Sequence, residues 1–331
     1  MKKDSTTRQS NLDTVAGLFI IYMIYMHCCQ WTETTDMQFN HVLSSVFVSF
    51  MAWFFFKSGM FHNFQHTVKS SAISSFKKLF KPYISFFIIG YFVLISFNLW
   101  EGDTDWHHYS LSIIKQSLCD GGTHKGALHL WFLVTLFLVK SLSPAILNKF
   151  NNLGVIFMGL TGCIFALIGK HLGGSLHPYY VFNFFPAMFF YILGNKLKEK
   201  QYCTVLFLLA SLFYIVSLLS PSLVDFRSNS IIYGHYSTWL VFATSGIIVF
   251  DNITRRVLPN IPIITTIGNE SIFWFVSHWF VLMVSAKSLR IFFPELTGML
   301  LLLYVFATVM ILLFIFRYLA YKTRLHMLLG L

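Results

Sequence analysis

The sequence predicts an all-α polytopic membrane protein with about ten transmembrane helices and both termini in the cytoplasm. Of its 331 residues, 56% are apolar and only 11% are charged, whereas soluble domains carry about 25% charged residues. Apolar runs long enough to cross about 30 Å of hydrocarbon recur along the whole chain. Runs such as residues 301–316 lack the alternating pattern of a membrane β-barrel, so helices are expected.

The apolar runs define ten expected spans within a single integral-membrane domain, residues 1–331. No linker, repeat or low-complexity segment divides the chain. The first run follows a basic start, as in a signal peptide, but no A-x-A cleavage site follows, so we expect an uncleaved first span. The spans are expected at residues 15–31, 42–60, 83–100, 127–144, 153–170, 181–197, 205–219, 234–250, 264–286 and 296–316.

The basic residues predict the orientation. With the N-terminus inside, 18 of the 24 lysines and arginines lie on the cytoplasmic side, as the positive-inside rule requires. The net charge of +11 is therefore spread between spans and does not form a nucleic-acid-binding patch. The acidic, His-rich segment 101–108 is expected outside, as a solvated loop or as a surface that faces a ligand.

Few ionisable side chains lie inside the expected spans, and each is a candidate for function because insertion costs about 2.5–3.5 kcal/mol. His27 lies beyond the middle of the first span, His129 in the outer part of the fourth and His278 near the middle of the ninth. Lys57 lies near the inner end of the second span. A membrane histidine can instead serve as a hydrogen-bonding contact between helices, so both interpretations stay open.

A basic segment, residues 77–81, leads directly into the third span. Lys78 and Lys81 are three residues apart and would share a helix face, so their ammonium groups could bind one phosphate. Simple anchoring at the inner membrane surface explains the same segment. The five cysteines show neither CxxC pairs nor zinc spacing, and no metal site is expected.

Five short motifs are spread over most of the chain in a fixed order. They are Asp13 to Gly17 and His27; Phe54-Phe55-Phe56-Lys57-Ser58-Gly59; Lys78-x-x-Lys81-Pro82-Tyr83; His129-Leu130-Trp131-Phe132-Leu133; and Gly268-x-x-Ser271 followed by His278. Together they resemble the acyltransferase-3 family of membrane-bound O-acyltransferases, which includes glycan O-acetyltransferases.

The resemblance implies transfer of an acetyl group from cytoplasmic acetyl-CoA to a hydroxyl of a cell-surface polysaccharide or lipid-linked glycan, in the bacterial inner membrane. Neither a metal nor a nucleic acid is expected. A sugar hydroxyl is a poor nucleophile, so a histidine within hydrogen-bond reach would activate it. The expected roles are catalytic for His27 and Asp13, CoA-binding for Lys57, Lys78 and Lys81, and substrate-binding for His129, Trp131, Ser271 and His278.

Two variants of the mechanism use a covalent intermediate. An acyl group could pass through His27 itself. A thioester on Cys28 or Cys29 is disfavoured, because adjacent helix positions diverge by about 100°.

One position departs from the family pattern. Ala16 stands where the family has Arg or Lys. The first two spans are expected to be antiparallel neighbours, so Lys57 could supply the missing charge at a similar depth. Lys57 could equally extend to the inner headgroups. A glycan or lipid transporter or flippase without acyl transfer is the alternative function, and a non-catalytic sensor or scaffold is a third.

Overall fold

The computed structural model describes residues 10–63, 66–100, 102, 112–113, 115–117, 119–150, 153–198, 203–256 and 261–329. Over these residues the regular secondary structure is helical apart from one antiparallel hairpin, β1 (Leu223–Asp225) with β2 (Ser230–Tyr233). Within the described ranges, seven helical segments are long and apolar enough to cross a membrane. The predicted class, an all-α polytopic membrane protein, is confirmed. Apart from Gly102, the acidic segment 101–108 lies outside the described residues.

The seven segments match seven of the expected spans. The expected spans at 181–197, 205–219 and 234–250 correspond to α10 (Phe184–Leu197), α11 (Thr204–Leu219) and α12 (Tyr236–Arg256). A helix of 14 residues, such as α10, is only about 21 Å long. The number of ten spans and the side on which the termini lie therefore stay predictions.

Two expected spans are each broken into two helices, which corrects the sequence prediction. The span expected at 264–286 consists of α13 (Pro262–Asn269) and α14 (Ser271–Phe292), with the break at Glu270. The Glu270 carboxylate accepts two hydrogen bonds, of 2.6 and 2.7 Å, from the guanidinium of Arg317 on α15 (Gly298–Lys322). The span expected at 42–60 consists of α2 (Gln38–Val46) and α3 (Phe50–Met60). Hydropathy is averaged over a window longer than these breaks, so it cannot detect them.

The third span is longer than expected. Helix α4 (Val68–Ser75), the π-helical turn η1 (Phe76–Phe80) and α5 (Lys81–Trp100) follow one another without a gap. Because π-helical hydrogen bonds join residues five apart, the turn is wider than an α-helical one. Residues on either side of η1 therefore do not keep the α-helical face relationship.

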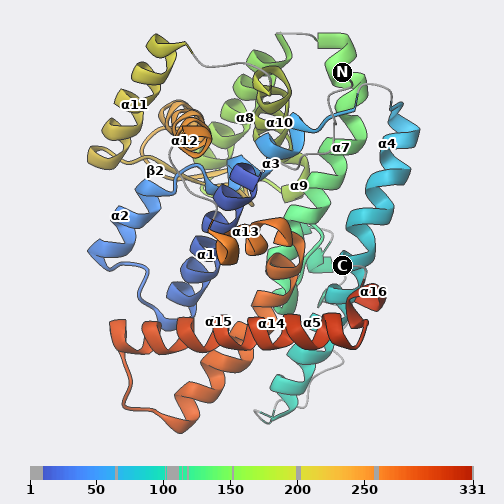
Figure 1. The fold of residues 1–331 in the computed structure, drawn as a ribbon, viewed down its shortest axis with the longest axis vertical. Helices are drawn as coiled ribbons and strands as arrows, with labels where there is room; N and C mark the ends of the chain where they lie inside the picture. Colours follow the sequence, from blue (N-terminus) through green and yellow to red (C-terminus); the bar gives the residue numbers. More distant parts are fainter. Residues whose placement is uncertain are drawn as a thin grey trace.

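Helix α1 (Ser10–Thr32) lies at the centre of the bundle (Figure 1). It contacts α3, α12, α13, α14 and α15. Helix α3 packs closely on α10, because a side chain at Gly59 would meet the Tyr191 carbonyl and one at Gly194 would meet the Phe56 carbonyl. Small residues at such crossings let membrane helices approach through their backbones.

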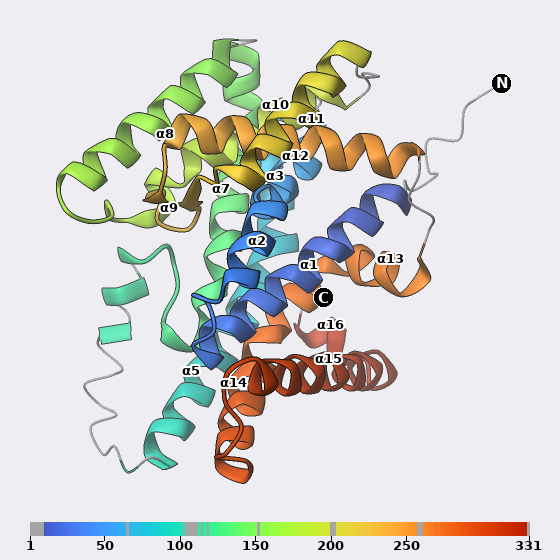
Figure 2. The same cartoon turned by 90° about the vertical axis from the view of Figure 1, so that its left-hand side faces the viewer.

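The remaining helices complete the bundle. They are α7 (Trp131–Phe150), entered through the 3₁₀ turn η2 (Lys125–Leu130), with α8 (Leu153–His171), α9 (Tyr179–Phe182) and the short α16 (Leu325–Leu329). Helix α15 lies across α14 at the edge of the bundle (Figures 1 and 2). Large apolar side chains are exposed along α5, α8, α11 and α15. These helices therefore present the faces expected to contact lipid.

Candidate functional site

Three histidines that are far apart in the sequence meet in the structure. The ring centroid of His278 on α14 lies 5.2 Å from that of His27 on α1 and 5.1 Å from that of His129 in η2. The ring of Trp279 lies 5.2 Å from His27 and 5.7 Å from His129. The sequence nominated the three histidines separately, and the fold brings them into one cluster, the histidine cluster.

Each ring of the histidine cluster is fixed by one short hydrogen bond. The Nδ1 of His27 lies 2.8 Å from the Gln30 side-chain oxygen, and the Nδ1 of His278 lies 2.7 Å from the Phe275 carbonyl oxygen. The Nε2 of His129 lies 3.1 Å from the Val276 carbonyl oxygen. An amide oxygen can only accept, so each of these nitrogens donates its hydrogen. In neutral His27, the lone pair is therefore on Nε2.

Helix α7 begins later than expected. The sequence predicts the fourth span from Ala127, but α-helical geometry starts only at Trp131, after a kink at Ala127 (φ −148°, ψ 38°). His124 stabilises this turn, because its Nδ1 accepts from the Gly126 amide at 3.1 Å and its Nε2 donates to the Phe87 carbonyl at 3.1 Å. His129 therefore stands in a 3₁₀ turn.

The turn η2 packs against α5 at two glycines. A Cβ on Gly90 would lie 2.6 Å from the Gly126 carbonyl oxygen. Only glycine allows this approach, which sets the depth at which η2 carries His129 into the bundle.

A cavity of about 660 Å³ opens beside the histidine cluster. His27, His129 and Trp131 line it, whereas His278 is fully buried and is absent from its wall. The volume lies within the usual range for small-molecule sites. We call it the outer cavity because the hairpin that borders it is predicted to lie outside. Its aromatic and polar walls include Tyr22, Gln30, Ser44, Ser175, Asp225, Phe226, Arg227, Ser228, Ser230, Trp239 and Trp279.

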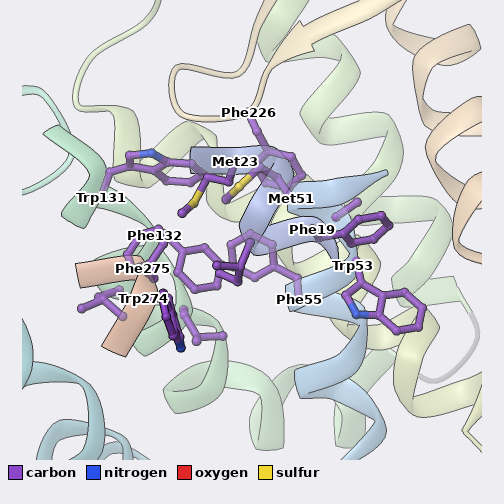
Figure 3. Packing of buried hydrophobic residues seen from close by; sticks show 14 of the residues in the cluster. Phe19, Met23, Met51, Trp53, Phe55, Trp131, Phe132, Phe226, Trp274 and Phe275 are labelled. Carbon is purple, nitrogen blue, oxygen red and sulfur yellow. The ribbon is translucent and has the colours of Figure 1, made fainter. Parts of the chain in front are cut away.

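A second, smaller cavity adjoins the outer cavity. Its volume is about 30 Å³. Met23, Met51 and Phe275 line both spaces, and we call these three side chains the partition. Figure 3 shows them within the packed core. We call the second space the inner cavity. Its walls are almost entirely apolar, and Ser271 supplies a hydroxyl. Ser271 is about 10 Å along α14 from His278, so it does not share the outer cavity with the other expected substrate-binding residues.

The expected catalytic residue Asp13 is paired with the expected CoA-binding residue Lys57. The Lys57 Nζ lies 2.8 Å from the Asp13 Oδ1, and the Asp13 side chain is only 4% exposed. Asp13 is about 21 Å from His27 along α1, so the two side chains cannot act on the same reacting atom. Lys57 thus reaches the stretch of α1 that contains Ala16, as two antiparallel neighbours would allow.

The expected phosphate clamp, Lys78 with Lys81, is divided by helix geometry. Lys78 lies inside the π-helical turn η1, and Lys81 begins α5. The ammonium group of Lys81 donates to the Met327 carbonyl oxygen of α16 at 2.8 Å. Lys78 instead lies near enough to Lys140 of α7 for their charges to interact. Lys140 is about 14 Å along α7 from Trp131, on the side away from the outer cavity.

His62 extends this basic region at the end of α3. Its Nδ1 lies 2.9 Å from the Tyr191 hydroxyl. Burial, followed by the positive charges of Lys198, His66 and Lys140, lowers the pKa of His62 below its usual range. His62 is therefore neutral near pH 7, and the local positive charge belongs to the lysines.

Several site residues were not identified from the sequence. Gln30 follows His27 by one helical turn, which is a signal that could have nominated it. Trp279 adjoins His278 in the sequence. Lys140 lies inside the expected span 127–144, where its charge was a signal that could have nominated it. Arg227 carried no local signal. Within the described ranges, no group of three or more His, Cys, Asp or Glu residues could hold a metal ion.

The fold and the site define a multi-pass membrane protein in which two members of the histidine cluster, His27 and His129, border a large cavity. The sequence model of an acyltransferase domain family matches residues 9–320, nearly the whole chain. The chain therefore belongs to the acyltransferase-3 family and is a membrane acyltransferase. No curated protein and no solved structure matches it.

Proposed function

We propose that the protein transfers an acetyl group from cytoplasmic acetyl-CoA to a hydroxyl of a cell-surface or lipid-linked glycan, with His27 as general base. One observation carries this proposal. His27 stands in the wall of a cavity with aromatic and polar sides, and Met23, Met51 and Phe275 line both that cavity and a small apolar one. The volume of the outer cavity suits a sugar, and the apolar side chains of the inner cavity suit the methyl of an acetyl group.

The proposed chemistry is a direct transfer. The Nε2 of His27 accepts the proton of the sugar hydroxyl while the oxygen attacks the thioester carbonyl carbon. The carbon–sulfur bond then breaks, and the CoA thiolate takes the proton back from the imidazolium. In the variant through acyl-His27, Nε2 attacks the thioester carbonyl carbon, the carbon–sulfur bond breaks and the CoA thiolate leaves. The oxygen of the sugar hydroxyl then attacks the acyl group, the bond between carbon and Nε2 breaks, and the hydroxyl proton passes to the thiolate. Tyr22, Trp131 and Trp279 contribute aromatic surface against which a sugar ring can pack.

The donor would bind at the opposite side of the partition. Lys78 and Lys140 present two interacting positive charges, which suit the phosphates of CoA. The lysine of the Asp13–Lys57 pair supplies a third cation near the start of α1. Lys81 fits this role less well than the sequence predicted, because its ammonium group is bonded to Met327.

The remaining expectations belong to the same proposal. We place the protein in a bacterial inner membrane as one domain, with both termini in the cytoplasm and the outer cavity facing away from it. The distribution of basic residues supports this orientation.

The test is acetyl transfer by the purified protein in detergent, with radiolabelled acetyl-CoA and a panel of glycan acceptors. We expect label in an ester bond to sugar, released by mild alkali. Reconstituted vesicles test the alternative in parallel. Glycan uptake without label transfer to any acceptor would contradict the proposal and favour a transporter.

A further inference from the structure

We propose that Arg227 binds an oxyanion carried by the acceptor glycan, so that the protein selects an acidic acceptor over a neutral one. This inference rests on the proposed function, because it assigns the outer cavity to the acceptor. The residues that carry it belong to the tip of the β1–β2 hairpin, residues 225–230, which we call the hairpin tip.

The hairpin tip is inserted into the bundle by an aromatic anchor. Phe226 is 5% exposed, and its ring lies 5.2 Å from that of Phe55, 5.8 Å from that of Trp239 and 6.1 Å from that of Trp131. Asp225 and Arg227 flank this anchor and line the outer cavity. The anchor therefore holds two charged residues at the wall of the proposed acceptor site.

Polar contacts fix the backbone of the hairpin tip. The Asn183 amide donates to the Arg227 carbonyl at 2.9 Å and accepts from the Thr135 hydroxyl at 2.9 Å. The Asn229 amide donates to the Gly162 carbonyl at 3.0 Å and accepts from the Tyr236 hydroxyl at 3.0 Å. Such a loop is ordered before ligand binds, which lowers the entropic cost of recognition.

The two charged side chains of the hairpin tip, Asp225 and Arg227, make different kinds of contact. Both oxygens of Asp225 accept within the tip, one from the Arg227 amide at 3.0 Å and one from the Ser228 hydroxyl at 2.6 Å. The Arg227 guanidinium lies 5.3 Å from the centre of the Tyr179 ring. Among the described residues, no carboxylate lies within ion-pair distance of it. Ring stacking leaves the in-plane N–H groups of an arginine available to an anion.

The position of Arg227 suits a substrate anion. Arg227 and His27 line the same cavity and are close enough for their charges to interact. A carboxylate or phosphate matches the fork of a guanidinium through two parallel hydrogen bonds. The serine hydroxyls beside it, Ser175, Ser228 and Ser230, are linked at 2.6 and 2.8 Å and can bond to sugar hydroxyls. An acidic sugar held there would present a neighbouring hydroxyl toward His27.

Binding can be tested without turnover, by tryptophan fluorescence of the full chain in detergent. The probes are methyl glucuronoside, glucose 1-phosphate and methyl glucoside, which differ in the anion. We expect the first two to bind at least tenfold more tightly than the third. Preference for only one charged probe identifies a carboxylate or a phosphate as the recognised group. Equal binding of all three in the unmodified protein would overturn the inference, even if no variant folds.

Variants then assign the effect to Arg227. Arg227→Gln should lower the affinity for the two charged probes about tenfold without changing the affinity for methyl glucoside. Arg227→Lys should recover part of the lost affinity. Arg290→Gln is the matched control, because Arg290 is half-exposed, lies outside the cavity wall and bonds to Glu33 and Trp31. If Arg227→Gln weakened the binding of all three probes equally, Arg227 would only stabilise the hairpin tip, and the inference would be wrong. Acetyl transfer to no acceptor would refute the proposed function while leaving selective anion binding measurable.

Discussion

The imidazole rings of His27 and His278 are stacked, with centroids 5.2 Å apart and planes 20° from parallel. His27 borders the outer cavity, whereas His278 is 0% exposed and lies behind it. We expect His278 to act as a positioning residue, because its ring contact restricts the orientation of the candidate base His27.

Because His278 is expected to act through its ring contact with His27, another aromatic ring at position 278 should preserve activity. We expect His278→Phe to keep kcat within about threefold of the unmodified enzyme, and His278→Ala to lower it about tenfold or more, because a cavity behind His27 frees its ring. The donor KM should change in neither variant, since the CoA side is distant. A kcat as low for Phe as for Ala would show that the imidazole of His278 has a chemical role.

Gln30 should act on the same ring from the other edge. Its oxygen lies 2.8 Å from the Nδ1 of His27, which keeps the lone pair on Nε2. Gln30→Leu should lower kcat about tenfold with an unchanged KM, and Gln30→Glu should retain activity because an acceptor oxygen remains. Steady-state kinetics with both variants decide this, and full activity of Gln30→Leu would contradict it.

The Asp13–Lys57 pair predicts a coupled effect on stability and activity. Replacing Lys57 by Met removes an ion-pair partner from a carboxylate that is 4% exposed, and so should lower the free energy of unfolding and the melting temperature. The double variant Asp13→Asn with Lys57→Met should recover the melting temperature. If Lys57 also replaces the family cation, the double variant should stay inactive.

Adding Ala16→Arg tests that replacement directly. Because Ala16 is one helical turn from Asp13, an arginine there could pair with it and restore part of the activity of Lys57→Met. Full activity of Lys57→Met alone would exclude compensation. Ala16 is fully buried, so Ala16→Met serves as the control for added volume.

The basic region predicts which lysines hold the donor. Lys78→Gln and Lys140→Gln should each raise the KM for acetyl-CoA about tenfold, because each removes one charge near the phosphates. Lys81→Gln should have a smaller effect, since Lys81 is bonded to Met327. The measurement is initial rate against acetyl-CoA concentration. If Lys81→Gln raised the KM for acetyl-CoA more than Lys140→Gln did, the result would favour the phosphate clamp of Lys78 and Lys81 that the sequence predicts.

Most of the architecture was accessible from hydropathy, because bilayer thickness sets helix length. The break at Glu270 was not, because its polar partner, Arg317, is 47 residues away in the sequence. Likewise, α-helical spacing could not predict the π-helical turn that contains Lys78 and ends just before Lys81. The three histidines could be identified as candidates because a polar side chain is costly inside a membrane. That they meet in one cluster could not be predicted, because the position of His129 depends on how η2 packs against α5.

The cavity walls were the least predictable part of the site. The hairpin tip lines the outer cavity although it belongs to the connection between the expected spans 205–219 and 234–250. Phe226 anchors it through ring contacts to α3, α7 and α12. Such contacts arise from tertiary packing, and no local pattern encodes them.

The role of His27 as the base for acyl transfer can be measured by single-turnover acetyl transfer with purified His27→Ala. We expect a rate about 10²–10⁴-fold below that of the unmodified protein, with unchanged CoA binding and a monodisperse elution profile. His41→Ala, at an exposed histidine of α2, should keep the full rate. Transfer by His27→Ala at the unmodified rate would show that His27 is not the base.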